Sequence, residues 1–316
     1  MGSAGNSIRY FLPPTLALPL KRLKRKLSVM PVRLLFPESS TSNRAVRVVI
    51  YGSSFNWLSR LGDFALWKDI PGVAEVLLLP DDSGKQIPRP FHTSCRTVII
   101  PLSEDNINNC PRNHPALIPN RRAVEILRNK ATFAAYINEY GLADLCPVTY
   151  ESGEHAEFPC ILKRVNASYG RDSMVLRSKQ ELARAVALSQ EEFILQSLVR
   201  GTTEYTTHCI CKDGRIIWSY SVGFEMDGPE EIRRGMVCKE HLGRVTPPAG
   251  TFAAIERVLA PLGYSGPCNV NYKRSGAGTI SIFEVNPRFG GSLMQLENVE
   301  SLREALSCVI DNATSC

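Results

Sequence analysis

Residues 282–292 read Ile-Phe-Glu-Val-Asn-Pro-Arg-Phe-Gly-Gly-Ser, and this stretch decides the fold. The run that enters it, 279–283, is rich in isoleucine and β-branched residues, which is typical of a strand. Side chains alternate between the two faces of a strand, so we expect Glu284, Asn286 and Arg288 to point to one side together. The proline between the last two cannot donate to a sheet ladder, so the strand should end there.

These three side chains suit one kind of ligand. Carboxylate and amide oxygens are the ligands that Mg²⁺ prefers, and a guanidinium is a planar fork that suits phosphate. Gly290 and Gly291 lack side chains, so the backbone there can come close to a bound molecule. The stretch therefore predicts a site for a nucleoside triphosphate and its metal. The alternative, for the stretch in isolation, is an edge strand with three solvated polar residues.

Composition and charge narrow the class of protein. The chain has 316 residues, 44% hydrophobic and 22% charged, which is typical of a globular protein with two or three subdomains. The formal charge of +6 arises near the amino terminus, where seven basic residues precede the first acid, Glu38. From Glu38 onward 30 basic residues face 31 acidic ones. The basic run has no interleaved aromatic residues, so nucleic-acid binding is not expected.

Residues 1–45 are predicted to form a basic, disordered leader. Its apolar run at 8–20 is broken by prolines and precedes the positive cluster at 21–26, whereas a secretory signal places its charges first. No run reaches the roughly 18 apolar residues of a transmembrane segment. Organelle targeting and attachment to a membrane surface stay open as alternatives for this leader.

The cysteines indicate a reducing compartment. None of the ten forms a Cys-x-x-Cys pair, and most lie in apolar runs, so we expect free thiols rather than disulfides. Cys209 and Cys211 share a face of a predicted strand, but the sequence shows no partners for a metal site there. A cytoplasmic location is therefore expected.

The first part of the body alternates strands with a helix. Strands are predicted at 47–51, 74–79 and 97–101, and a helix at 57–67. This spacing favours a small parallel sheet of the doubly wound type. The turn at 52–56 lacks the GxGxxG spacing of a dinucleotide-binding loop, so that function is not expected.

The remaining chain mixes hairpins with helices. Helical periodicity covers 121–140, with an interruption at 129–130, and residues 225–250 are polar and predicted as a loop over a site. Two strands at 160–163 and 174–176 flank a loop of small residues. The other predicted elements are a helix at 179–189, a strand at 193–196, a hairpin at 204–211 and 215–222, a helix at 251–262, a strand at 267–273 and a helix at 302–310.

The order of these features resembles the ATP-grasp superfamily, and most closely its carbamoyl-phosphate-synthetase-like branch of carboxylate–amine ligases. Residues 284–288, Glu-Val-Asn-Pro-Arg, match the most specific motif of that branch without a mismatch. Residues 269–271, Asn-Val-Asn, resemble its partner strand. The resemblance extends from Arg121 to Ser292.

The resemblance implies an α/β (α+β) protein with an ATP-grasp fold of two α+β subdomains, preceded by a small Rossmann-like pre-grasp domain. The implied boundaries are 46–120 for the pre-grasp domain and 121–312 for the ATP-grasp domain, with a lid subdomain at about 148–200. The leader at 1–45 precedes both domains.

Residues that contact ATP are also implied by the resemblance. Lys130 and Lys163 resemble the lysines that reach ATP phosphates. The segment of Gln196, Ser197 and Leu198 resembles the hinge against which adenine lies in the family. Residue 196 is glutamine where the family usually has glutamate.

Glu204 resembles the acid that holds the ribose hydroxyls. Asn271 resembles a residue that contacts ATP and the metal, although an amide is a weaker ligand than an acid. Together with Glu284 and Asn286, it would hold one or two Mg²⁺ ions, or Mn²⁺ in their place.

The implied activity is that of an ATP-dependent ligase that forms a C–N bond. A carboxylate would attack the γ-phosphate of ATP to give an acyl phosphate, and an amine would then displace phosphate. Lys163 and Arg288 are the implied catalytic residues, because they offset charge on the transferring group. The loop at 166–173 would close and exclude water.

The implied partners are a small-molecule carboxylic acid or amino acid and an amine. Arg233 and Arg234 lie where such ligases hold the acceptor carboxylate, with a solvated loop as the alternative. Backbone amides at Gly290, Gly291 and Ser292 would hold the acyl phosphate.

Two other functions stay open. One is a non-catalytic, ATP-binding regulatory protein. It is favoured by the departures at Gln196 and Asn271 and by Asn129, which stands where the family has the aspartate of an Asp-Lys pair. The other is a bicarbonate-activating carboxylase or synthetase of the same superfamily. A homodimer stays open as well.

Overall fold

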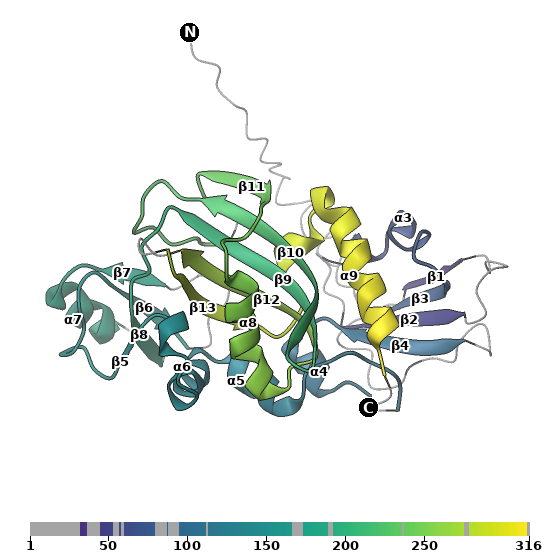
Figure 1. Cartoon of the computed structure of the whole chain (residues 1–316), viewed down its shortest axis with the longest axis horizontal. Coiled ribbons are helices and arrows are strands. Elements are labelled where there is room, and N and C mark those ends of the chain that lie inside the picture. Colours follow the sequence, from purple (N-terminus) through teal and green to yellow (C-terminus); the bar gives the residue numbers. More distant parts are fainter. Residues whose placement is uncertain are drawn as a thin grey trace, which may run out of the picture.

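The computed structural model describes residues 32–36, 45–52, 57, 60–79, 87, 95–111, 113–165, 173–188, 192–235, 237–274 and 278–314. Its strands form three sheets that follow one another along the long axis (Figure 1). We call them the first sheet, the central sheet and the lid sheet. The central sheet lies between the other two. Of the helices in the described part of the chain, none has the length and apolar character needed to cross a membrane.

The first sheet has a parallel core. Its order is β1 (Val32–Leu35), β3 (Val73–Leu79), β2 (Val46–Tyr51) and β4 (Arg96–Pro101), and β2 is parallel to both of its neighbours. Strands β2 and β3 are buried along their whole length, as expected for a parallel sheet covered on both faces. Two short helices accompany it, α3 (Phe64–Trp67) and α4 (Glu104–Asn108). The predicted parallel pairing is confirmed for β2, β3 and β4, and α3 occupies the end of the helix predicted at 57–67.

Strand β1 lies inside the segment predicted as a leader. It pairs antiparallel with β3 at the edge of the sheet. The ordered fold therefore begins before residue 46. A four-residue edge strand with Val32 and Leu35 exposed has no hydrophobic alternation that the sequence could reveal. Residues 1–31 and 37–44 of the predicted leader lie outside the described residues.

Two asparagines cap the amino-terminal ends of the two helices that follow the first sheet. Asn120 caps α5 (Arg121–Arg128), and its Oδ1 accepts a hydrogen bond from the Ala123 amide at 2.8 Å. Asn129 ends α5 and caps α6 (Lys130–Glu139) through the amides of the next turn. An asparagine side chain satisfies amides that lack intrahelical partners, so one residue can end one helix and start the next. This explains the interruption predicted at 129–130.

The lid sheet is small and antiparallel. Its order is β5 (Thr149–Tyr150), β8 (Phe193–Ser197), β6 (Cys160–Arg164) and β7 (Met174–Leu176), with α7 (Lys179–Leu188) beside it. Leu182 of α7 packs on Leu162, Leu176 and Leu195 of the sheet. The predicted hairpin of β6 and β7 forms, and residues 166–172 between them lie outside the described residues.

The central sheet has five antiparallel strands. They are, in order, β11 (Glu240–Arg244), β10 (Arg215–Glu225), β9 (Thr203–Lys212), β12 (Gly266–Arg274) and β13 (Ile280–Asn286). The prediction of a loop throughout 225–250 is wrong at β11. This edge strand is exposed or half-buried along its length, so it lacks the apolar pattern that marks a strand.

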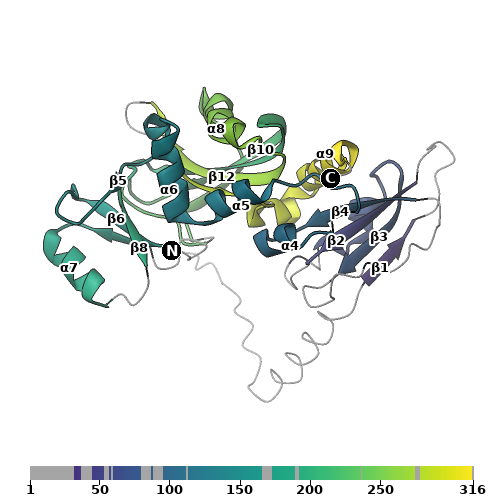
Figure 2. The ribbon, with the colours of Figure 1, turned by 90° about the horizontal axis from the view of Figure 1, so that it is seen from below.

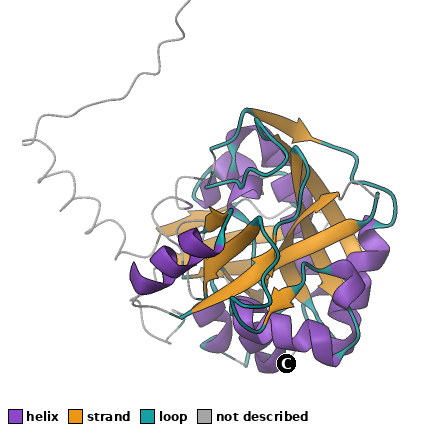
Figure 3. Ribbon diagram, turned by 90° about the vertical axis from the view of Figure 1, so that its left-hand side faces the viewer, coloured by secondary structure: helices purple, strands orange, loops and turns teal. Residues whose placement is uncertain are grey.

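Helices cover the two faces of the central sheet differently. Helices α5, α6 and α8 (Thr251–Leu259) pack on one face, where Cys209, Cys211 and Cys268 are buried (Figure 2). Helix α9 (Val299–Asn312) packs on the other face. Seen along the long axis, several helices lie at the margin of the strands (Figure 3). The remaining turns are the 3₁₀ helices η1 (Ala143–Leu145), η2 (Ala260–Leu262), η3 (Gly291–Met294) and η4 (Leu296–Asn298).

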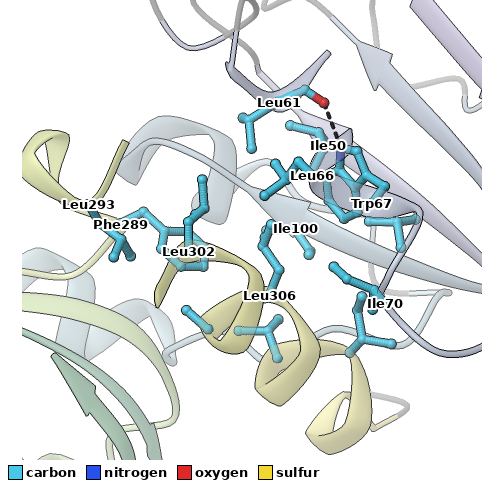
Figure 4. Close-up of a cluster of buried hydrophobic side chains, with 14 of the residues drawn as sticks. Ile50, Leu61, Leu66, Trp67, Ile70, Ile100, Phe289, Leu293, Leu302 and Leu306 are labelled. Carbon is cyan, nitrogen blue, oxygen red and sulfur yellow. Dashed lines mark hydrogen bonds between the residues drawn. The ribbon is translucent and has the colours of Figure 1, made fainter. Parts of the chain in front are cut away.

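Helix α9 joins the first sheet to the central sheet. Its Leu302 and Leu306 pack between Ile100 on the first-sheet side and Phe289 on the other (Figure 4). Trp67 is buried in the same cluster, and its Nε1 donates to the Leu61 carbonyl at 2.7 Å. Each buried methylene stabilises a fold by about 0.8 kcal/mol, so this cluster links the two sheets strongly.

Candidate active site

A cavity of about 620 Å³ lies between the lid sheet and the central sheet. Most of the predicted site residues line it. They are Lys130, Lys163, Ser197, Leu198, Glu204, Arg233, Arg234, Asn271, Glu284, Asn286, Arg288 and Gly291. Gln196 and Gly290 lie directly behind the wall, where they contact Lys163 and His208. The structure thus brings together residues that span more than half of the chain.

Two rows of polar side chains cross strands β9, β12 and β13 at the cavity wall. Both rows follow from the antiparallel register, which places their members opposite one another. In strand order, the rows are Thr206–Asn271–Glu284 and His208–Asn269–Asn286. Alternate residues of the same strands are buried on the opposite face, under α5 and α8.

Hydrogen bonds hold the first row in place. Asn271 Nδ2 donates to Glu284 Oε2 at 2.7 Å, and Thr206 Oγ1 donates to Asn271 Oδ1 at 2.7 Å. The oxygen that we predicted as a metal ligand is thus engaged by Thr206. In this arrangement Asn271 orients the Glu284 carboxylate.

The donor set fits a magnesium ion shared with a phosphate. Glu284 and Asn286 line the same cavity, and Asn286 Nδ2 donates to Asn269 Oδ1 at 3.2 Å, which leaves the Asn286 oxygen for a ligand. The described residues contain no group of three or more His, Cys, Asp or Glu that could hold a metal by themselves. Mg²⁺ in nucleotide sites usually takes one or two protein oxygens and completes its shell with phosphate and water.

Lys163 enters the cavity from the end of β6. Its Nζ donates to Gln196 Oε1 at 3.0 Å and lies 5.2 Å from the centroid of the Phe283 ring. Gln196 in turn donates to Thr149 Oγ1 at 3.0 Å, so the amide is fixed from both ends. Burial lowers the pKa of Lys163 to about 8, and the nearby Glu284 carboxylate works against this shift.

Glu204 already has a cationic partner. Arg233 Nε donates to Glu204 Oε1 at 2.7 Å, and its other nitrogens donate to the Gly235 carbonyl at 2.8 Å and to Thr206 Oγ1 at 3.3 Å. The same guanidinium lies 4.1 Å from the centroid of the Phe224 ring. Arg233 is therefore held by four contacts, three hydrogen-bond partners and one aromatic ring. Its neighbour Arg234 contacts the lid, where it donates to the Ser173 carbonyl at 3.4 Å.

Arg288 contacts α4, the short helix that accompanies the first sheet. Its Nε donates to Glu104 Oε1 of α4 at 3.0 Å, and its NH1 donates to the Phe289 carbonyl at 3.0 Å. Asn269 Nδ2 holds the Arg288 carbonyl at 3.2 Å. Sequence reasoning missed Glu104, because 184 residues separate it from Arg288.

Sequence reasoning also missed His208, Thr206 and Lys273. His208 and Thr206 continue the alternate positions of Glu204 along β9, and Lys273 continues those of Asn271 along β12. The period of two that we applied to 284–288 would have found all three. Lys273 lines the cavity, its Nζ donates to the Glu231 carbonyl at 2.6 Å, and burial lowers its pKa.

We expected glycine at 290 so that the backbone could approach a bound molecule. In the structure, neighbouring side chains limit the space at Gly290. A Cβ there would lie 2.4 Å from Cε1 of His208 and 2.9 Å from Cγ of Asn269. Glycine is therefore required by the packing of these side chains behind the wall. At Gly291 a Cβ would meet nothing within 4 Å.

No protein-family model and no curated protein matches the chain. Solved structures do match. An L-amino acid ligase from Bacillus licheniformis is 15% identical with a TM-score of 0.55, over 87% of this chain and 76% of that one. Phosphoribosylamine–glycine ligase from Thermotoga maritima is 17% identical with a TM-score of 0.56, over 86% and 77%.

A biotin carboxylase domain shows a similar likeness. This domain of 2-oxoglutarate carboxylase from Hydrogenobacter thermophilus, solved as a dimer with MgADP, ADP and bicarbonate, is 12% identical with a TM-score of 0.56, over 86% and 70%. These likenesses, at 12–17% identity and TM-scores of 0.55–0.56, show that the chain has the ATP-grasp fold.

Proposed function

We propose that the chain is an ATP-dependent carboxylate–amine ligase that acts through an acyl phosphate. The observation that carries this proposal is the convergence of Glu284, Asn286, Arg288 and Lys163 on one cavity. An acid, an amide and two cations in that arrangement provide what phosphoryl transfer needs, which is positioning and charge neutralisation.

The charge of the cavity supports a polyphosphate ligand. Among the described residues that line it, six are cationic and two are carboxylates. Lys130 and Lys163 would contact the phosphates, since lysine is a long, mobile point charge. Ser197 and Leu198, at the end of β8, would hold the adenine through their backbone. Glu204 would hold the ribose hydroxyls alongside Arg233.

Glu284 and Asn286 would hold Mg²⁺, and Asn271 would keep the Glu284 carboxylate in position. When bound, the ion would offset negative charge on the phosphates of ATP. Phosphate and water oxygens would complete the coordination shell of the ion, so no further protein ligand is needed.

The chain's own residues would then assist two steps. The acid's carboxylate oxygen attacks the γ-phosphorus while the bond to ADP breaks, and Lys163 offsets the charge on the moving group. The amine nitrogen attacks the acyl carbon and phosphate leaves, while Arg288 stabilises the oxygen that gains charge. Backbone amides at Gly291 and Ser292 would hold the acyl phosphate.

Arg234 is the better of the two candidates for binding a substrate carboxylate. Arg233 is anchored by Glu204, Thr206, Gly235 and Phe224, whereas within the described residues the Arg234 side chain donates to one carbonyl, that of Ser173. A side chain with unused donors can accept a carboxylate without breaking an ion pair. The acid and amine would be small molecules such as amino acids.

Calorimetry with ATP, with and without Mg²⁺, tests the site. We expect wild type to bind ATP in a magnesium-dependent way and Glu284→Gln to lose that dependence while keeping its thermal unfolding temperature. ADP release with a panel of acids, bicarbonate included, and amines would then identify the substrates. Wild type that binds no nucleotide would overturn the proposal.

A non-catalytic nucleotide-binding protein is the second candidate. It is favoured by the two ion pairs in which Glu104 and Glu204 engage Arg288 and Arg233. Magnesium-dependent ATP binding without ADP release, across the whole panel, would support it.

A further inference from the structure

His208 is a buried histidine that the proposed reaction does not use. It lies on β9 with 2% of its surface exposed, opposite Asn269 on one neighbouring strand and Tyr220 on the other. Its Nε2 lies 2.8 Å from the Ser292 hydroxyl. Ser292 lines the cavity, so this pair joins a buried ring to the site where the ligand would bind.

Both members of the pair are held in place. The His208 ring is stacked against Tyr220 with centroids 6.4 Å apart, and a Cβ on Gly290 would lie 2.4 Å from its Cε1. The Ser292 carbonyl accepts a hydrogen bond from Asn298 Nδ2 at 2.8 Å, and Asn298 Oδ1 accepts one from the Tyr220 hydroxyl at 2.5 Å. Such a closed network positions side chains more firmly than one contact does.

The surroundings of Nδ1 decide which way the hydrogen bond runs. Nδ1 is buried and has no hydrogen-bond partner among the described residues. A neutral imidazole carries one proton, and an unpaired buried N–H is rarer in proteins than an unpaired acceptor. The proton therefore belongs on Nε2. In that tautomer the ring donates to Ser292 Oγ.

A donation from His208 sets the direction of the Ser292 hydroxyl. The Ser292 oxygen accepts that hydrogen bond, so the hydroxyl proton must point away from His208. Ser292 borders the cavity, which leaves this proton for a ligand there. Arg288 and Asn286 border the same cavity. A hydroxyl donor in the same cavity as a guanidinium suits an oxygen that carries negative charge.

We infer that His208 is a positioning residue that donates to Ser292, so that the Ser292 hydroxyl donates to an anionic oxygen of the acid substrate. The inference rests on the proposed function for the identity of the ligand, and on the geometry alone for the tautomer. Burial, with the charge of Arg233, lowers the pKa of His208 to about 3, so the ring stays neutral at ordinary pH.

The tautomer is measured first, on the full chain labelled with ¹⁵N-histidine. Long-range ¹H–¹⁵N spectra distinguish the two neutral tautomers from imidazolium, and His208→Gln assigns the signal by removing one of the five histidines. We expect a ring protonated on Nε2 that does not titrate between about pH 6 and 8. A ring protonated on Nδ1, or one that titrates in this range, would overturn the inference.

Kinetics test the role of Ser292. Each L-amino acid is offered as the acid, with hydroxylamine as the amine, and hydroxamate and ADP are measured. We expect Ser292→Ala and His208→Leu to lower kcat about 100-fold while the Kd for MgATP changes less than about threefold. His208→Gln, whose amide can reach the position of Nε2, should recover about tenfold of the loss. Ser265→Ala, in the turn before β12, is the matched control.

The outcomes separate the two proposals. Wild-type kcat in Ser292→Ala would overturn the inference and leave the ligase intact. Equal losses in His208→Leu and His208→Gln, with both variants folded, would overturn the positioning role. A wild type that forms no hydroxamate with any acid would count against the ligase, whereas the tautomer would still decide the direction of the Ser292 bond.

Discussion

Glu104 of α4 and Arg288, which follows β13, form an ion pair at 3.0 Å. Both side chains are mostly buried, at 21% and 16% exposed, so the contact is shielded from solvent. A change in α4 can therefore alter the position of Arg288, which we propose to act in catalysis.

Removal of Glu104 should misplace Arg288. We expect Glu104→Ala to lower kcat about tenfold or more, because small displacements of a positioned group are costly, with the Kd for MgATP within about threefold of wild type. Glu104→Gln keeps an acceptor and should lie between the two. Steady-state ADP release measures the effect, and wild-type kcat in Glu104→Ala would show that Arg288 needs no such support.

ATP binding should weaken as pH rises through about 8. Burial lowers the pKa of Lys163 to about 8, so its ammonium is charged below this pH and neutral above it. A neutral amine has no charge to offer phosphate, and affinity should therefore fall on the alkaline side. Lys163→Arg stays charged and should flatten the profile, although its geometry differs. Calorimetry from about pH 7 to 9 tests this, and an unchanged wild-type slope in Lys163→Arg would assign it to another group.

Glu230 should hold the lid against the body. Its carboxylate pairs with Arg177 after β7 and with Arg200 after β8, the latter at 3.1 Å. We expect Glu230→Gln to speed hydrogen exchange across β7 and α7, and added salt to do the same in wild type. Glu192→Gln, at an exposed glutamate next to β8 of the lid sheet, is the control. Identical exchange in the two variants would mean that apolar packing alone holds the lid.

Loss of packing at α9 should destabilise the fold. Leu306 is fully buried, so we expect Leu306→Ala to lower the free energy of unfolding by about 2–5 kcal/mol. The same change at Leu296, which is 74% exposed, should cost less than about 0.5 kcal/mol. Urea unfolding of both variants measures the difference. A small effect at Leu306 would indicate that the cluster relaxes into the space.

The fold could be predicted where the sequence carries a period. Buried parallel strands and amphipathic helices repeat with periods that the sequence shows directly, and the alternation at 284–288 placed three site residues on one face. The edge strands β1 and β11 were missed, because strands exposed on both faces have no apolar pattern.

The contacts within the site were harder to predict. Glu104 reaches Arg288 through the packing of two domains, and the pairing of Arg233 with Glu204 depends on how a polar segment folds back over β9. Alternation shows which face a residue occupies, but it does not show which partner arrives from a distant element. His208 illustrates this, since its neighbours come from β10, β12 and η3.

The position of α9 between two sheets has a consequence for synthesis on the ribosome. The first sheet is translated early, yet Leu302 and Leu306, which cover its apolar face, are translated near the end of the described chain. Until then Ile50, Trp67 and Ile100 lack their cover. We expect the nascent first domain to remain a client of chaperones while the lid and central sheet are made, and to become protease-resistant only after α9 has emerged.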